Sequence, residues 1–310
     1  MHRKSIYMSV AASLLFMYAA AQQSIIRVDS FYSAAVQNQT KYTAILPANY
    51  DIDKNKRFPV VYLLHGYEGN YATWITWSKL PVQLATEYQC IIILPDGGNS
   101  WFVNWSGQTD GKPHKWEDMI MKELIPFIDR KYRTIPNKNS RIIGGLSMGG
   151  FGSISIGLRN PGKFGFVFSI SGDLTFCNTI KEELAKDSVL YDSPQLLGYD
   201  SSVMADIKGF ATQTERTPKG KIFVTAAQAD AYNPFELIKN IDTATLPFIH
   251  IDCGLSDDFI NDARQFKEAV SRKTKRYSYL EMPGGHHSPY WGEAIRHVFL
   301  DIKQELLKVN

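Results

Sequence analysis

Short hydrophobic runs alternate with longer amphipathic segments along most of the chain. The runs are typical of strands that are covered on both faces, and they lie at 59–64, 91–94, 141–145, 164–171, 247–252 and 277–282. Hydrophobic residues recur with helical spacing at 116–132, 149–160, 258–272 and 291–307. Because strands that alternate with helices form parallel sheets, we predict an α/β fold with a mostly parallel central sheet and helices on both faces.

Two segments depart from this pattern. Residues 25–35 and 39–46 alternate polar and apolar positions, which predicts an antiparallel pair of strands near the N-terminus. Residues 172–220 are polar, show little periodicity and lie between two predicted strands. We expect them to form an insertion that caps the carboxyl edge of the sheet, because long irregular connections often carry function. The alternative is a peripheral helical excursion that only covers the sheet.

The first 21 residues have the features of a secretory signal peptide. His2, Arg3 and Lys4 supply a positive start, residues 9–20 are mostly apolar, and 19–21 offer a small-residue cleavage site. We therefore expect residues 1–21 to be removed and residues 22–310 to be exported, to the periplasm or the medium. An uncleaved anchor is the alternative. No later stretch approaches the ~18 apolar residues that a membrane helix needs.

Composition narrows the class of protein further. The 310 residues carry a formal charge of +3, and two of the basic side chains, Arg3 and Lys4, belong to the predicted signal peptide. The nearly neutral remainder gives no electrostatic signature for nucleic acid. The 3 cysteines imply no disulfide framework. We expect Cys90 and Cys253 to be small core residues, and a bridge that involves Cys177 stays open.

A candidate nucleophile follows the apolar run at 141–145. Residues 145–149 read G-x-S-x-G, with Ser147 at the centre. In a nucleophile elbow a strand turns sharply into a helix and exposes the serine hydroxyl at the turn. Flanking glycines let the neighbouring backbone approach closely. The pattern therefore predicts that Ser147 is the nucleophile of an acyl-transfer enzyme.

A serine of this kind needs a histidine to take its proton. His286 and His287 follow two glycines after the last predicted strand, where the chain order Ser, acid, His places the base. His250 lies inside a predicted strand and fits a core role better. His65 is expected to shape its own turn. The alternatives for the histidine pair are a loop feature or a chance metal site.

The acid of the triad is expected just after a strand. Asp257 and Asp258 stand at the exit of the run at 247–252, and we favour Asp257 over Asp258. The other carboxylate is then expected to cap the helix that begins near Phe259. Asp252 should point into the strand. The alternative is that both carboxylates only cap the helix.

The turn at 65–69 reads H-G-x-x-G and closes a buried strand. In α/β-hydrolases this turn supplies one N–H donor of the oxyanion hole, and the residue after the nucleophile, here Met148, supplies the second. The chain therefore carries the sequence signals of a nucleophile, a base, an acid and an oxyanion hole.

These motifs resemble those of the esterase D / feruloyl esterase-like family of α/β-hydrolases. The similar segments are Y-L-L-H-G-x-x-G at 62–69 with Trp74, P-D-G-G-x-S-W at 95–101, G-x-S-M-G-G at 145–150, C-G-x-x-D at 253–257, and G-G-H at 284–286 with Trp291. The resemblance implies a single α/β-hydrolase domain over 22–310. It also implies His286 as base, Asp257 as acid and the N–H of Tyr67 as an oxyanion donor.

The chain departs from the family pattern after the histidine. Ser288 stands where the family has its first tryptophan, His287 makes an unusual doublet, and residues 255–258 lack the more usual threonine. These differences concern the acyl-side pocket more than the chemistry. Several aromatic residues lie in loops expected near the catalytic edge, and of these we expect Trp101 and Trp291 to bind substrate, since aromatic faces suit sugar rings or phenolic acyl groups. The alternative is that they pack loops onto the sheet.

The sequence thus predicts an exported serine carboxylic ester hydrolase that works through an acyl-enzyme. The resemblance implies feruloyl or acetyl esters of plant polysaccharide, or similar small esters, as substrates. One alternative is an acyltransferase of the same fold, and another is a carbohydrate-binding homologue without catalysis. We expect no cofactor, no metal, no nucleic-acid partner and no stable membrane span.

Overall fold

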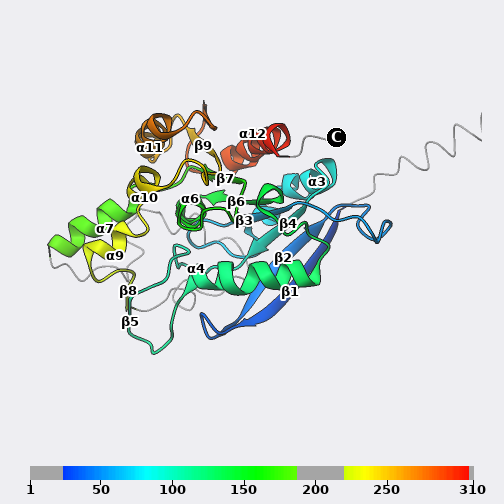
Figure 1. The fold of residues 1–310 in the computed structure, drawn as a ribbon, viewed down its shortest axis with the longest axis horizontal. Coiled ribbons are helices and arrows are strands. Elements are labelled where there is room, and N and C mark those ends of the chain that lie inside the picture. Colours follow the sequence, from blue (N-terminus) through cyan, green and yellow to red (C-terminus); the bar gives the residue numbers. More distant parts are fainter. Residues whose placement is uncertain (1–23, 187–219, 307–310) are drawn as a thin grey trace, which may run out of the picture.

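An eight-stranded sheet organises the molecule. The computed structural model describes residues 24–186 and 220–306. The strands of the sheet are β1 (Ile25–Ser33), β2 (Asn38–Leu46), β3 (Val60–Leu64), β4 (Ile91–Pro95), β6 (Arg141–Leu146), β7 (Phe166–Ile170), β9 (Phe248–Gly254) and β10 (Tyr277–Met282). They lie in the order β1-β2-β4-β3-β6-β7-β9-β10 (Figure 1).

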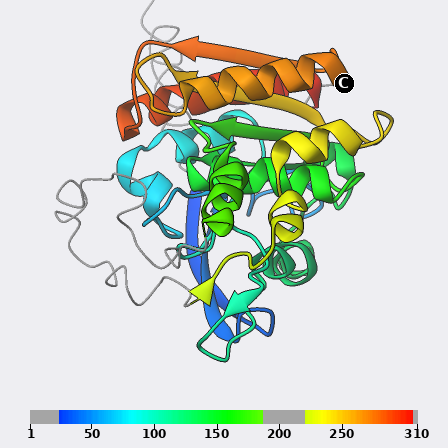
Figure 2. The ribbon, with the colours of Figure 1, turned by 90° about the vertical axis from the view of Figure 1, so that its left-hand side faces the viewer.

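The pairing confirms a mostly parallel sheet. β1 and β2 form the expected antiparallel pair, and β2 is also antiparallel to β4. Every pairing from β4 to β10 is parallel. Strands β3, β4, β6, β7 and β9 are buried along their whole length, as their continuous apolar runs predicted. Figure 2 shows the β1–β2 hairpin at one edge of the sheet and β10 at the other.

Helices cover both faces of the sheet. Their bounds are α2 (Thr73–Trp77), α3 (Leu80–Glu87), α4 (Trp116–Asp118), α5 (Ile125–Lys131), α6 (Met148–Arg159), α7 (Phe176–Ala185), α9 (Ala226–Asp230), α10 (Pro234–Asn240), α11 (Ile260–Lys273) and α12 (Ser288–Glu305). Side chains of α3 and α12 share one hydrophobic cluster, and those of α5, α6, α10 and α11 share the other. In Figure 1, α3 and α12 lie side by side.

The helix predicted over 116–132 contains an unexpected π-helical segment. Met119–Leu124 joins α4 to α5, and the N–H of Ile125 donates to the carbonyl of Ile120, five residues back. Pro126 follows directly. Proline has no N–H, and its ring would clash with the carbonyl four residues earlier. A wider turn removes this clash, which gives a physical reason for the departure from a uniform helix.

The irregular segment 172–220 begins with a helix, whose bounds the sequence pattern did not predict. Within it the structure describes α7, which lies beside α9 at the left of Figure 1. The segment ends in β8 (Gly220–Lys221), which pairs with β5 (Gly107–Gln108). The rest of the predicted cap, 187–219, and the predicted signal peptide at 1–21 lie outside the described residues. Both stay predictions.

All three cysteines of the chain are free and buried. Cys90 and Cys253 are core residues as expected. A bridge that involves Cys177 is not formed, because its thiol lies inside the hydrophobic cluster under α7. Among the helices of the described segments, none is long and apolar enough to cross a membrane.

Hydrogen bonding between strands continues past their carboxyl ends. The N–H of Ser147, just after β6, donates to the carbonyl of Ile170 at 3.0 Å. The N–H of Ser171, just after β7, donates to the carbonyl of Asp252 at 2.8 Å. The three strand exits β6, β7 and β9 are therefore tied together at the edge where the candidate residues lie.

Candidate active site

Ser147 occupies a strained turn between β6 and α6. Its backbone has φ 53° and ψ −123°, a conformation that a non-glycine residue rarely adopts. The flanking glycines are required for packing. A Cβ on Gly145 would lie 2.6 Å from the carbonyl oxygen of Leu64, and a Cβ on Gly149 would lie 2.5 Å from that of His65. The turn therefore has the geometry of the predicted nucleophile elbow.

The structure brings Ser147, His286 and Asp257 together. Nε2 of His286 lies 3.0 Å from Oγ of Ser147. Nδ1 of the same ring lies 3.1 and 3.2 Å from the two carboxylate oxygens of Asp257. Ser147 follows β6, Asp257 follows β9 and His286 follows β10, so one edge of the sheet supplies all three residues. This arrangement can pass a proton from a serine hydroxyl to an imidazole whose other nitrogen is oriented by a carboxylate.

The alternatives for base and acid lie elsewhere. The ring of His287 accepts a hydrogen bond from the N–H of Tyr290, which caps α12. Asp258 is exposed, whereas Asp257 is buried beside His286. The expectation that the second carboxylate caps the helix is wrong. Asp257 itself accepts the N–H of Phe259 at 3.0 Å, because its buried carboxylate has an oxygen that faces the start of α11.

The surroundings of Asp257 favour its ionised form. Burial opposes ionisation, but hydrogen bonds from His286 and from the N–H of Phe259 outweigh it and hold the pKa of Asp257 below its ordinary value. A carboxylate that stays negative can hold the imidazole in one tautomer and stabilise its protonated form.

The two backbone segments that the sequence predicts to supply the oxyanion donors meet at the elbow. The N–H of Ser147 is engaged with Ile170, so it is not available to an oxyanion. Met148 is the first residue of α6, and its N–H has no acceptor within the helix. Gly66, which precedes Tyr67, packs against the elbow, since a Cβ placed there would lie 3.3 Å from Cβ of Ser147.

The two tryptophans expected to bind substrate are largely buried. Trp101 is 5% exposed and stacks on Phe176 of α7, with ring centroids 3.5 Å apart. Trp291 is 8% exposed, and its ring meets the His286 ring edge-on at 5.0 Å. The structure thus places Trp291 against the ring of His286 and stacks Trp101 on Phe176. The sequence did not point to Phe176, because α7 lies in a segment without clear periodicity.

The sequence also did not point to a buried carboxyl group that lies just after β7. Asp173 follows β7 and is 6% exposed. Burial, with the negative charge of Asp262 as a second cause, raises the pKa of Asp173 to about 8. Asp262, in the first turn of α11, accepts the hydroxyl of Thr175 at 2.7 Å. The sequence shows two ordinary aspartates here, and only the fold brings them close together.

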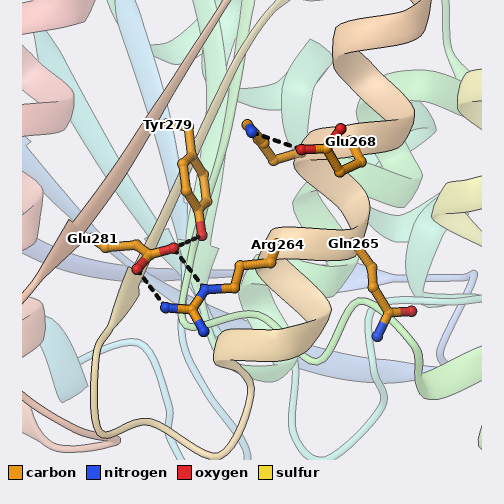
Figure 3. A pocket seen from close by; sticks show the side chains of 6 residues that line it. Arg264, Gln265, Glu268, Tyr279 and Glu281 are labelled. Atoms are coloured by element: carbon orange, nitrogen blue, oxygen red, sulfur yellow. Dashed lines mark hydrogen bonds and ion pairs between the residues drawn. The ribbon is translucent and has the colours of Figure 1, made fainter.

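A groove of about 410 Å³ lies apart from the triad, between α11 and β10 (Figure 3). Its charged side chains are paired with one another, Arg264 with Glu281 and Lys267 with Glu268, and the hydroxyl of Tyr279 donates to Glu281. None of the triad residues lines it. Within the described part of the chain, no group of three or more His, Cys, Asp or Glu side chains could hold a metal ion.

Known proteins share this fold. A solved ferulic acid esterase superposes with a TM-score of 0.67 at 22% identity, over 92% of this chain and 99% of that one. An S-formylglutathione hydrolase from Staphylococcus aureus gives 0.66 at 19% identity, over 90% and 98%. At these identities the likeness establishes the fold alone, which is that of the α/β-hydrolases.

The family follows from the sequence comparison. The family described as "Putative esterase" matches residues 33–302, and the chain belongs to it. An acetyl esterase of Caldicellulosiruptor saccharolyticus is 25% identical over 288 residues, which cover 87% of this chain and 95% of that protein. The resemblance to the esterase D / feruloyl esterase-like family is confirmed, and the chain is a carboxylesterase.

Proposed function

We propose that the protein hydrolyses carboxylic esters through a Ser147–His286–Asp257 triad. Ser147 Oγ attacks the ester carbonyl while Nε2 of His286 takes its proton, and the same nitrogen then protonates the departing alcohol. Water, activated in turn by His286, releases the acid from the acyl-enzyme. The observation that carries the proposal is the continuous contact from Ser147 to His286 to Asp257, at 3.0 and 3.1 Å.

The N–H groups of Tyr67 and Met148 are the proposed oxyanion donors. Both belong to segments that meet at the elbow, one from the turn after β3 and one from the start of α6. Donors fixed in this way are already oriented when the negative charge develops on the carbonyl oxygen, so they stabilise the transition state more than the substrate.

The proposed substrates are acetyl or feruloyl esters on plant polysaccharide, or similar small esters. The acetyl esterase relative, almost all of which this chain covers, supports the acetyl group. The ferulic acid esterase fold supports the aromatic acid. The sequence predicted Trp101 and Trp291 as substrate contacts, and only the 5% and 8% of these residues that is exposed could meet an ester. Export through the segment at 1–21 fits a substrate outside the cell, and protein recovered from the medium or periplasm should begin near Gln22.

The test compares p-nitrophenyl acetate, methyl ferulate and acetylated xylan with the wild type and Ser147→Ala. We expect Ser147→Ala to lower kcat by at least ~10⁴-fold, because no other group can form the acyl-enzyme. Ser271→Ala, near the far end of α11, is the matched control and should keep full activity. Equal activity of Ser147→Ala and wild type would refute the triad, and the preferred ester identifies the acyl group.

A further inference from the structure

The imidazole of His65 makes hydrogen bonds that have no part in the proposed triad. The ring is 1% exposed and lies between two loops at the carboxyl edge of the sheet. Its Nδ1 lies 2.7 Å from the carbonyl oxygen of Gly66, and its Nε2 lies 2.9 Å from the backbone nitrogen of Gly97. One ring therefore joins the turn after β3 to the turn after β4.

The identity of these partners determines where the proton of the ring lies. A backbone N–H can only donate, so Nε2 accepts from Gly97 and carries no hydrogen. A carbonyl can only accept, so Nδ1 carries the hydrogen and donates it to Gly66. The two contacts together require a neutral imidazole with its proton on Nδ1.

The carbonyl that His65 binds belongs to the same peptide unit as the N–H of Tyr67. The N–H of Gly69 also donates to this carbonyl, at 3.0 Å. Because a trans peptide is planar, its C=O and N–H point in opposite directions. Two donors that hold the carbonyl of Gly66 on one side therefore fix the direction of the Tyr67 N–H on the other.

A second contact holds the turn on the far side of Tyr67. The N–H of Glu68 donates to Oδ1 of Asn99 at 2.7 Å, and Glu68 adopts the left-handed conformation with φ 64°. Asn99 lies two residues after Gly97, so both contacts reach the same loop. The peptide units before and after Tyr67 are thus each hydrogen-bonded to groups outside the proposed oxyanion hole.

We propose that His65 is a positioning residue that orients the Tyr67 N–H toward the oxyanion. The inference rests on the proposed function, since it concerns the donor of that reaction. It predicts that loss of the hydrogen bond from Nδ1 to Gly66 weakens transition-state stabilisation and leaves the binding of the ester ground state nearly unchanged. If His65 served only in packing, its loss would lower the stability of the fold and would not weaken transition-state stabilisation selectively.

Two substitutions distinguish the hydrogen bond made by Nδ1 from the hydrogen bond made by Nε2. The amide of His65→Asn can place an N–H near the position of Nδ1, so it keeps the donor to Gly66 and loses the acceptor for Gly97. The longer His65→Gln places its amide near Nε2, so it keeps the acceptor and loses the donor. We expect His65→Gln to lower kcat on p-nitrophenyl acetate by about 10–100-fold with KM within about 2-fold, somewhat less than removal of a donor itself. His65→Asn should stay within about 5-fold of the wild type, well above the His65→Gln variant.

A second readout reports the oxyanion directly. An aryl trifluoromethyl ketone adds to the serine and forms a tetrahedral oxyanion, so its Ki should rise in His65→Gln by about the same factor as kcat/KM falls. Tm is measured for each variant, to separate folding from orientation. Equal kcat losses in the two variants, or an unchanged Ki in His65→Gln, would overturn the inference. If neither variant folds, Asn99→Ala removes the support on the other side of Tyr67 and should raise the same Ki; an unchanged Ki there also counts against it.

Ser147→Ala in the same assay separates this inference from the proposed function. If Ser147→Ala keeps its activity, the triad itself is wrong. If Ser147→Ala is inactive and His65→Gln keeps the wild-type kcat and Ki, only the role of His65 is wrong.

Discussion

At the scale of single residues, the Asp257 carboxylate performs two tasks. It contacts Nδ1 of His286 and also accepts the N–H of Phe259 at the start of α11. The sequence predicted the candidates from their place after a strand, but it divided these tasks between neighbouring carboxylates. Which of two adjacent aspartates turns inward depends on the backbone conformation of the loop at 254–259, and the residue pattern does not encode this.

Asp257→Asn tests the first task. We expect kcat to fall by about 10⁴-fold, because an amide cannot favour the tautomer and charge of the imidazole that the reaction needs. Steady-state hydrolysis of p-nitrophenyl acetate measures the loss. Asp258→Asn is the matched control, and its exposed side chain should leave kcat within about 2-fold. A large loss in Asp258→Asn instead would reassign the acid.

Asp173→Asn tests the buried carboxyl group just after β7. The pKa of Asp173 is about 8 in the folded protein and near 4 when unfolded, so the folded state holds a proton that the unfolded state releases between these values. Stability conferred by the protonated form is therefore lost as the pH rises from about 4 to 8. The neutral asparagine removes this dependence of stability on pH. We expect the Tm of Asp173→Asn, relative to wild type, to rise by at least about 4 °C between pH 5 and pH 9.

Thermal melts at both pH values provide the measurement, with the exposed Asp258→Asn as control. If the difference in Tm between Asp173→Asn and wild type stays constant with pH, Asp173 is ionised in the folded protein at pH 7.

At the scale of elements, the strands were predictable and several helices were not. Continuous apolar runs such as the one at 91–94 identify strands covered on both faces, and the structure contains them with bounds that differ by at most two residues. Short helices such as α2, α9 and α10 offer too few turns for a periodic signal. The helix α7 carries only three buried residues and lies in a polar segment. Consequently the Phe176–Trp101 stack could not be predicted.

The close packing of α6 against the turn after β3 can be tested at Gly149. Gly149→Ala places a methyl group 2.5 Å from the carbonyl oxygen of His65 and 2.7 Å from that of Leu64. Backbone cannot yield as a flexible side chain can, so we expect a fall in Tm of roughly 3–10 °C despite the better helix propensity of alanine.

Gly292→Ala in α12 is the matched control. Its nearest neighbour would lie 3.8 Å away, an ordinary contact, so helix propensity alone should raise Tm by about 1–3 °C. Differential scanning calorimetry measures both variants. A shift of the same sign in the two variants would show that close packing at Gly149 does not govern the effect.

At the scale of the whole molecule, stability rests on two hydrophobic layers and on no covalent cross-link. The clusters on either side of the sheet bury residues from nearly every described element. A chain of this length can bury enough apolar surface without disulfides. The sequence predicted this from its length and cysteine count, because neither depends on local conformation.

The three buried thiols make this testable. Burial raises the pKa of Cys90 to about 12 and also raises those of Cys177 and Cys253, so thiolate is scarce and inaccessible in the folded protein. We expect no reaction of the native protein with Ellman's reagent at pH 8, and three thiols per chain after unfolding in guanidinium chloride. Tm should be the same with and without dithiothreitol. Rapid labelling of the native protein would show that one of the three sites opens readily.

The backbone bonds that tie Ser147 to Ile170 and Ser171 to Asp252 have a consequence for how such an enzyme can vary. Ser147, the proposed nucleophile, continues the sheet, so it has no freedom to shift without disturbing three strands. The turn at 65–69 and the loop that carries His286 are held as well, the first by the ring of His65 and the second by the backbone bond from Ser256 to Gly284. Adaptation to a new ester is therefore open to side chains around this fixed backbone more than to the backbone itself.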